Sequence, residues 1–203
     1  MTEHVPGPAG RPLVVVLGVS GSIAAYKAAE LASRLAQRGH QVHVVLTRAA
    51  AQLVTPATFY PLTGNPVHGE LFAAESAGGG ARVEHVGLAE RADVFAIAPA
   101  TAHTIARLAL GLADDFLTTL VLAYRGPVLV APAMNDQMYA HPAVAHNLET
   151  LRRWGYEVIE PEQGALACGR WGAGRLADPQ RILARIEALG AARPSEPGRG
   201  ELV

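Results

Sequence analysis

A turn rich in glycine and serine follows the first apolar run of the chain. The run is LVVVLG at 13–18, and the turn reads Gly18-Val19-Ser20-Gly21-Ser22. Glycines let the backbone approach a ligand, and the free amides at a helix start, together with serine hydroxyls, attract an anion. The turn lacks the full G-x-G-x-x-G spacing and the lysine-serine ending of a P-loop. It therefore indicates a phosphate site without specifying the nucleotide, and a helix cap without a ligand is the alternative.

The end of the second apolar run narrows the choice of nucleotide. An NAD site usually has a carboxylate there to hold the ribose hydroxyls, whereas this chain has Thr47 and Arg48. Ordinary NAD binding is therefore disfavoured, but NADP stays open because Arg48 would meet its additional phosphate. A mononucleotide such as FMN needs only a phosphate cradle and hydroxyls, and Ser20, Ser22, Thr47 and Thr101 would supply these.

Two later turns also follow predicted strands. They are PATAHT at 99–104 and PAMNDQMY at 132–139. Because the carboxyl ends of parallel strands meet at one edge of a sheet, we expect both turns to lie beside the first. The carboxamide of Asn135 would then hold a carboxylate or a flavin edge. A helix cap at Thr101 and an ordinary turn at Asn135 are the alternatives without a ligand.

Two side chains outside these turns are suited to proton transfer. His85 precedes a predicted helix with the sequence VGLAERAD, and Cys168 is the only cysteine, within GALACG at 164–169. That small-residue setting is poor for a core residue, and a thiol on a flexible loop would reach a ligand and donate a proton. A purely structural role is the alternative for both residues.

The elements that must position these residues alternate between strands and helices. Strands are predicted at 13–18, 42–47, 93–99, 126–132 and, last, 156–161. Helices are predicted by apolar spacing at 24–35, through Ile105, Leu108 and Leu112, through Phe116, Leu120 and Tyr124, from Pro142 to Leu151, and from Pro179 with Asp178 as its cap. This alternation predicts a single-domain α/β fold, a doubly wound, Rossmann-like or flavodoxin-like parallel sheet with helices on both faces. Segments 61–84 and 162–177 do not fit, and we predict them as functional loops.

Composition excludes several classes of protein. The net charge of −1 over 203 residues gives no excess field for nucleic acid or lipid, and no apolar run reaches the roughly 20 residues of a membrane span. A single cysteine excludes an internal disulfide and favours a reducing compartment, so we expect a cytoplasmic protein. Residues 1–11 and 191–203 are predicted as disordered ends of a domain at 12–190. The low charged fraction of 17% and the apolar segment 105–124 indicate burial between subunits.

Six motifs, taken in order, resemble a known family, the homo-oligomeric flavin-containing cysteine decarboxylases. The resemblance covers residues 12–190, and PAMN followed by ACG is its specific part. The motifs are GVSGSIAAYK at 18–27, TPATFYPLTGNPV at 55–67, HVGLAERAD at 85–93, APATAHTIARLALGLADDFLTT at 98–119, PAMNDQMY at 132–139 and ACG at 167–169.

The resemblance implies an FMN site, a substrate site and catalytic residues. The implied FMN contacts are Gly18, Ser20, Gly21, Ser22, Thr47, Thr101, Ala102, His103, Thr104 and Ala131. The implied substrate contacts are Met134, Asn135, Ala167, Cys168 and Gly169, and the implied catalytic residues are His85, Asn135 and Cys168. His103 stands where the family usually has asparagine, and Tyr139 replaces a frequent tryptophan. No metal is expected.

The implied reaction is the FMN-dependent decarboxylation of 4'-phosphopantothenoylcysteine to 4'-phosphopantetheine in coenzyme A biosynthesis. It proceeds by transient oxidation to a thioaldehyde, loss of carbon dioxide and re-reduction. Cys168 is expected to donate a proton, Asn135 to anchor the carboxylate, and His85 to act as base or positioning group.

The resemblance also implies partners and leaves rival functions. The implied partners are further copies of the chain, as a trimer or a larger assembly, and a separate phosphopantothenate–cysteine ligase, with neither nucleic acid nor membrane. Three alternatives stay open: a peptidyl-cysteine decarboxylase, a flavin prenyltransferase, and a non-enzymatic flavin-binding regulatory subunit. PAMN with ACG speaks against the prenyltransferase, and the presence of all three catalytic candidates speaks against the regulatory subunit.

Overall fold

A five-stranded parallel sheet forms the centre of the molecule in the computed structural model, which describes residues 11–69, 84–167 and 169–192. Its strands are β1 (Val14–Val19), β2 (Gln41–Leu46), β3 (Val94–Ala100), β4 (Val128–Pro132) and β5 (Glu157–Val158). They lie side by side in the order β2-β1-β3-β4-β5. The two strands that follow β1 in the sequence therefore lie on opposite sides of it, β2 on one side and β3 on the other. This switch in strand order opens a crevice at the carboxyl ends of the two strands, where α/β proteins bind ligands.

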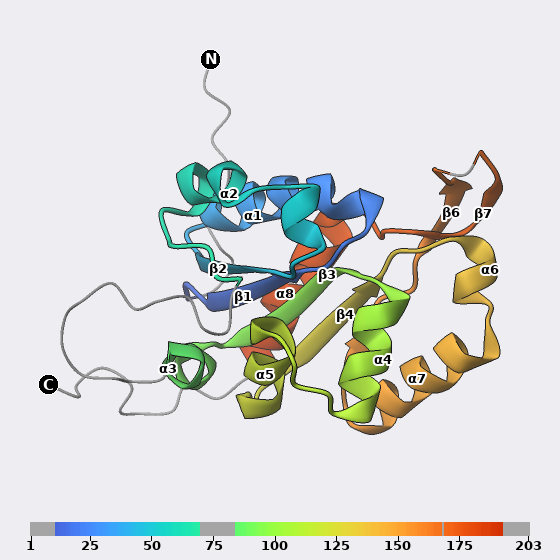
Figure 1. Cartoon of the computed structure of the whole chain (residues 1–203). Coiled ribbons are helices and arrows are strands. Elements are labelled where there is room, and N and C mark those ends of the chain that lie inside the picture. The colour runs from blue at the N-terminus through green and yellow to red at the C-terminus, as the bar shows by residue number, and fades with distance from the viewer. Residues whose placement is uncertain (1–10, 70–83, 168, 193–203) are drawn as a thin grey trace, which may run out of the picture.

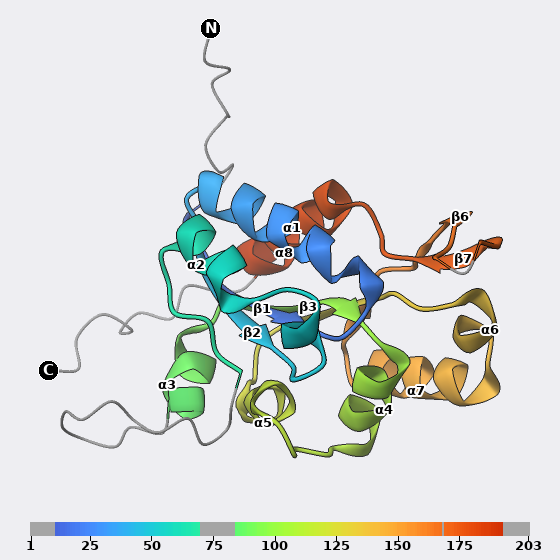
Figure 2. The same cartoon turned by 45° about the horizontal axis from the view of Figure 1, so that its top comes forward.

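Helices cover both faces of this sheet, as Figures 1 and 2 show. On one face, α1 (Tyr26–Gln37), α2 (Pro56–Thr63) and α8 (Pro179–Ala192) pack against one hydrophobic cluster. On the other, α3 (Glu84–Arg91), α4 (Ala102–Leu110), α5 (Phe116–Ala123) and α7 (Pro142–Arg153) pack against a second cluster. Alternate residues of β1 enter the two clusters, Val15 and Leu17 the first and Val16 the second. The doubly wound α/β fold predicted from the sequence is confirmed.

Side-chain caps set where several helices begin. Ser22 precedes η1 (Ile23–Ala25), a 3-10 turn that leads into α1, so the first predicted helix starts with a tighter turn. Thr101 caps α4 and Asp115 caps α5, each by accepting a hydrogen bond from the third residue that follows it. The predicted cap of the last helix is confirmed, since Asp178 Oδ1 accepts from the Gln180 amide at 2.7 Å. Two shorter elements complete the chain, η2 (Ala50–Gln52) and α6 (Asp136–Tyr139).

The loop predicted at 162–177 is wrong, because most of this segment forms an antiparallel hairpin. Its strands are β6 (Glu162–Ala165) and β7 (Trp171–Arg175), which pair with each other and lie beside α6 in both views (Figures 1 and 2). Both strands are short and contain glycine, so neither shows the apolar alternation that indicates a strand. The strand predicted as the last, at 156–161, is consequently not the last, and its regular part is only Glu157–Val158.

Three smaller predictions also differ from the structure. Leu112 does not continue the apolar stripe of α4, because Gly111 ends that helix with φ +66° and leaves Leu112 49% exposed. The first residues of the loop predicted at 61–84 belong to α2, and 70–83 lie outside the described residues. The last helix runs to Ala192, two residues past the predicted end of the domain. Among the residues that the structure describes, no helix is both long and apolar enough to cross a bilayer.

Candidate active site

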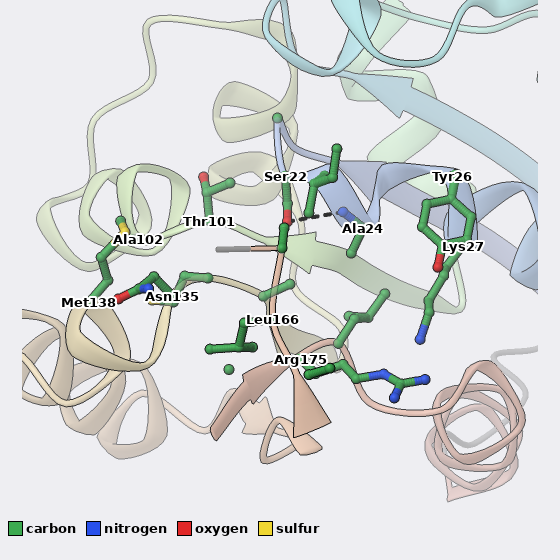
Figure 3. Close-up of a pocket in the computed structure, with 18 residues that line it drawn as sticks. Ser22, Ala24, Tyr26, Lys27, Thr101, Ala102, Asn135, Met138, Leu166 and Arg175 are labelled. Atoms are coloured by element: carbon green, nitrogen blue, oxygen red, sulfur yellow. Dashed lines mark hydrogen bonds between the residues drawn. The ribbon is translucent and has the colours of Figure 1, made fainter. Parts of the chain in front are cut away.

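A cavity of about 560 Å³ lies at the carboxyl ends of β1, β3 and β4, with the hairpin along one side. Four segments that are distant in sequence line it, and Figure 3 shows their side chains converging on it. They are the turn after β1, the start of α4, the turn between β4 and α6, and the strands β6 and β7 with the residues beside them. The sequence-based expectation that the first three turns share one rim of the sheet is confirmed. The segment that forms the hairpin was predicted as a loop, so a pair of strands beside the cavity was not expected.

Ser20 joins two of these segments to each other. Its side chain is 1% exposed, and its Oγ donates to the Pro99 carbonyl oxygen at 2.8 Å and accepts from the Thr101 amide at 2.9 Å. The backbone amide of Ser20 also donates to the Pro99 oxygen, at 3.2 Å. Because the single hydroxyl proton of Ser20 is used within the protein, the structure gives this residue a positioning role. It holds the β1 turn against the end of β3.

Gly21 and Ser22 form the β1 side of the cavity. A Cβ on Gly21 would lie 2.5 Å from the Cβ of Ala49, so a glycine is required for the turn to approach the segment after β2. Ser22 Oγ accepts from the Ala24 amide at 3.3 Å, and because this bond uses a lone pair, the hydroxyl proton is left to point to a ligand in the cavity. These residues fit the phosphate cradle predicted from the sequence.

The start of α4 forms the second side. Thr101 Oγ1 accepts from the Thr104 amide at 3.2 Å and lies 3.1 Å from the Thr104 hydroxyl, and Thr101 and Ala102 line the cavity. Thr104 is buried behind them at 2% exposure. His103, predicted as a cofactor contact, is exposed on α4 and is not among the described lining residues.

Asn135 lies at the third side, where the turn after β4 leads into α6. Its Oδ1 accepts from the Gln137 amide at 2.9 Å and so caps α6, which fixes the carboxamide at the cavity. Met134, another predicted contact, also lines the cavity, and its amide donates to the Gly174 carbonyl of β7 at 2.9 Å. A Cβ on Gly174 would lie 2.2 Å from the Met134 oxygen, so only glycine allows the hairpin to dock on this turn.

The tyrosine at the end of α6 connects the same turn to the segment that follows β5. The Tyr139 hydroxyl donates to Glu160, whose other carboxylate oxygen accepts from Arg152 at 2.5 Å. Partial burial, and then the Glu160 carboxylate, raise the pKa of Tyr139 to about 12. Tyr139 therefore keeps its proton at physiological pH and holds α6 as a hydrogen-bond donor.

Three of the predicted cofactor contacts lie within strands of the sheet or directly after one. Gly18 is inside β1, where a Cβ would lie 2.5 Å from Leu117 Cδ1, so its position is explained by packing. Thr47 is 8% exposed and accepts from the Ala50 amide at 3.2 Å, while Ala131 is buried in β4. None of the three is among the described lining residues.

The remaining candidates are described only in part. Ala167 lines the cavity, and Gly169 is exposed with φ +79°. Cys168 lies outside the described residues. The backbone of His85 belongs to α3, so this residue does not precede the helix as predicted, and its side chain lies outside what the structure describes.

Several lining residues were not singled out by the sequence. Lys27 was quoted only as part of a motif, although a cation near the start of a helix is itself an unusual signal. Arg175 gave no signal because its strand was predicted as a loop. The others are side chains to which sequence reasoning assigns no role, namely Ile23, Ala24, Tyr26, Ala133, Met138, Ala165, Leu166, Gly174 and Leu176.

Comparison with known proteins shows which family this chain belongs to. The sequence model of the family described as Flavoprotein matches residues 9–190. The chain belongs to the Flavoprotein family. Among curated relatives, the flavoprotein is 42% identical over 175 residues to a probable phosphopantothenoylcysteine decarboxylase of Streptococcus mutans, covering 85% of this chain and 96% of the relative. It is 46% identical to the coenzyme A biosynthesis bifunctional protein CoaBC of Vibrio vulnificus over 182 residues, which are 89% of this chain and 44% of the relative. The chain thus spans less than half of that longer relative.

Solved structures agree with the family assignment. The flavoprotein superposes on a Cys-to-Ser mutant of PPC decarboxylase complexed with pantothenoylaminoethenethiol, with a TM-score of 0.80 and 29% identity over 90% of this chain and all of the other. It also matches the FMN-dependent cysteine decarboxylase SpaF, with a TM-score of 0.73 and 34% identity, covering 89% of this chain and 98% of the other.

Proposed function

We propose that this flavoprotein uses FMN to decarboxylate 4'-phosphopantothenoylcysteine to 4'-phosphopantetheine, a step of coenzyme A biosynthesis. One observation carries the proposal: the β1 turn, the PAMN turn and the residues just before Cys168 converge on one cavity at the switch point of the sheet. The relative from Streptococcus mutans, which matches along nearly its whole length, is named for this decarboxylation.

The residues around the cavity fit FMN better than a dinucleotide. Ser22 and Thr101 offer hydroxyls beside the Gly21 turn, and Ala102, Ala133 and Met134 offer an apolar surface for a flat ring. The NADP alternative depended on Arg48, which is exposed and is not among the described lining residues. When bound here, FMN would supply a reversible acceptor for one pair of electrons.

The chain's own residues would bind the carboxylate and move protons. We assign Asn135 as the anchor of the substrate carboxylate, because its cap on α6 fixes a carboxamide whose nitrogen can only donate hydrogen bonds. We assign Cys168 as the proton donor to the carbon that loses carbon dioxide, because Ala167, the residue before it, lines the same cavity. His85 is assigned as base or positioning group on the family resemblance alone.

We further propose that the protein is a cytoplasmic homo-oligomer, with a trimer as its smallest assembly. The apolar segment 105–124 supports this, because it leaves Leu110 69% exposed and Leu122 53% exposed on the single chain. A phosphopantothenate–cysteine ligase would supply the substrate.

The test is to load the purified chain with FMN and follow carbon dioxide and product by mass spectrometry. 4'-Phosphopantothenoylcysteine should yield 4'-phosphopantetheine, whereas Cys168→Ser should release product about 10²- to 10⁴-fold more slowly, as expected when a proton-transfer group is removed. Normal product release by Cys168→Ser would contradict the assigned role.

A peptidyl-cysteine decarboxylase is the second candidate, because the description of SpaF, an FMN-dependent cysteine decarboxylase 34% identical to this chain, does not specify which cysteine derivative is decarboxylated. A peptide ending in cysteine is therefore offered beside the first substrate in the same assay. Faster turnover of the peptide than of 4'-phosphopantothenoylcysteine would replace the proposed substrate with this one. A chain that binds FMN and turns over neither would support the regulatory role.

A further inference from the structure

The cavity carries two cationic side chains and, among the described residues that line it, no acidic one. The cations are Lys27 and Arg175, which come from α1 and β7. We propose that they form a subsite for a phosphate monoester at the end of the substrate remote from its cysteine, so that the hairpin selects a phosphorylated small molecule over a peptide. The identity of the rest of the ligand rests on the proposed function.

Lys27 occupies a position that is unfavourable for a cation without an anion beside it. It is the second residue of α1, which continues the 3-10 turn Ile23–Ala25, so it lies just past the first turn of the helical segment, where the helix dipole repels positive charge only weakly. It is half-buried, and the carboxylate one turn away, Glu30, already pairs with Arg34 at 2.8 Å. Within the described part of the chain, no hydrogen bond or ion pair involves the Lys27 ammonium. An anion in the cavity would compensate both the dipole and the partial loss of hydration.

Arg175 is likewise left without an acidic partner in the described structure. Its register partner across the hairpin is Glu162, but Glu162 Oε1 accepts from the Asp178 amide at 2.9 Å, at the start of α8. The Arg175 side chain instead crosses the face of Gly164, where a Cβ would lie 3.2 Å from Cδ and 3.3 Å from Nη1. The glycine thus gives the guanidinium room over β6, and its planar donors suit phosphate oxygens.

The placement of these cations favours the substrate over the cofactor as the source of the phosphate. In Figure 3, Lys27 and Arg175 extend toward the same side of the cavity, whereas Asn135 and Met138 lie on the other side. Asn135 is the assigned anchor of the carboxylate, so a ligand held there would reach the cations with its opposite end. The FMN phosphate is already provided for by the Gly21 turn and the hydroxyls of Ser22 and Thr101.

The experiment measures binding of a matched ligand pair to the FMN-loaded chain by calorimetry. 4'-Phosphopantetheine and pantetheine differ only in the phosphate, so their affinity ratio reports the subsite. We expect the unaltered chain to prefer the phosphorylated ligand by 10- to 100-fold, the range of one or two charge-assisted contacts. Arg175→Gln and Lys27→Gln should each reduce that ratio about 10-fold, and Arg175→Lys should keep part of it. Arg170→Gln, on the same hairpin but outside the cavity lining, should leave the ratio unchanged.

Two controls separate the possible failures. FMN and riboflavin affinities are measured by fluorescence for each variant. A loss of FMN affinity without a loss of riboflavin affinity would assign the cations to the cofactor phosphate and overturn the proposal. A ratio that stays the same in Arg175→Gln and Lys27→Gln would also overturn it, even if the chain decarboxylates its substrate. Conversely, a chain that shows the ratio and its loss in the variants but does not decarboxylate the substrate would overturn the proposed function and leave the subsite standing.

Discussion

The central sheet and the β6–β7 hairpin contribute to the same cavity in different ways. The sheet strands β1 and β3 lie between two hydrophobic clusters, and their residues are almost completely buried. The hairpin strands are mostly exposed or half-buried, with Trp171 at 76% exposure, and they dock through the contact between Met134 and Gly174. Damage to the sheet should therefore lower global stability, whereas damage to the hairpin should lower activity while the fold persists.

The largest effect is expected where α5 packs on the sheet, at the contact between Leu117 and Gly18. Leu117 is 1% exposed, and Leu117→Ala should lower the free energy of unfolding by about 2–5 kcal/mol, measured by urea denaturation. Gly18→Ala alone would clash with the leucine. The double variant should lose less unfolding free energy than the two single variants lose together, because the new methyl group enters the space that the leucine leaves.

The double variant also tests whether Gly18 contacts the cofactor. If Gly18 serves packing alone, the double variant should bind FMN as the unaltered chain does. A loss of FMN affinity in a folded double variant would restore Gly18 as a cofactor contact. Strict additivity of the two stability changes would show that the two residues do not interact.

The hairpin is tested by Gly174→Ala. The added Cβ would lie 2.2 Å from the Met134 oxygen, so the hairpin must shift away from the turn that carries Asn135. We expect a loss of about 10²-fold in kcat for decarboxylation, as for a catalytic group displaced by roughly 1 Å, with the thermal unfolding of the sheet nearly unchanged. Gly39→Ala is the matched control, because Gly39 also has positive φ but has no atom near its Cβ position. Equal losses of activity in both variants would contradict the docking role.

The free energy of unfolding at acid pH should depend on His43, a buried residue of β2. Burial first, then the charges of His68 and Arg91, lower the pKa of His43 from 6.5 to about 4. The unfolded chain therefore takes up a proton at a higher pH than the folded chain. His43 should cost no stability above pH 6.5, and it should lower the free energy of unfolding by about 2 kcal/mol as the pH falls from 8 to 5. His43→Leu should flatten this part of the profile, and an unchanged slope would exclude His43 as its cause.

The smallest effect is expected where α6 contacts the segment after β5. Tyr139→Phe removes the hydrogen bond to Glu160 and should cost about 1 kcal/mol in unfolding free energy. Because the folded-state pKa of Tyr139 is about 12, above its ordinary value of 10.0, this contribution is present below pH 10 and lost as the pH rises toward 12. Tyr60→Phe, on an exposed ring of α2, is the control. A change as small as that of the control would show that the bond to Glu160 does not hold α6.

The same contrast explains how much of the fold could be predicted from the sequence. Strands such as β1 and β3 are apolar on both faces and appear as unbroken runs, and Asp178 followed by proline fixed the start of α8. The hairpin strands have no such run, because Gly164, Gly172 and Gly174 serve close contacts with Arg175, Asp136 and Met134. These contacts depend on residues distant in the sequence, so local patterns could not indicate them.

The site could be predicted as a set of turns but not as a set of contacts. Ser22, Thr101 and Asn135 were predicted at one rim because parallel strands end there, and the structure confirms their placement. Ser20 and Gly18 belong to the same motif, yet Ser20 bonds to the end of β3 and Gly18 packs against Leu117. These tertiary contacts cannot be read from the motif. Arg175 became visible only when β7 was seen to pass the cavity.

We propose that the cavity between the sheet and the hairpin holds the flavin beside Asn135. A crystal structure of the chain with FMN and 4'-phosphopantetheine tests it most directly. We predict the isoalloxazine ring against Ala102 and Met134, with the ligand extending from Asn135 toward the hairpin. FMN bound at any other surface, or a nicotinamide cofactor in its place, would contradict the account.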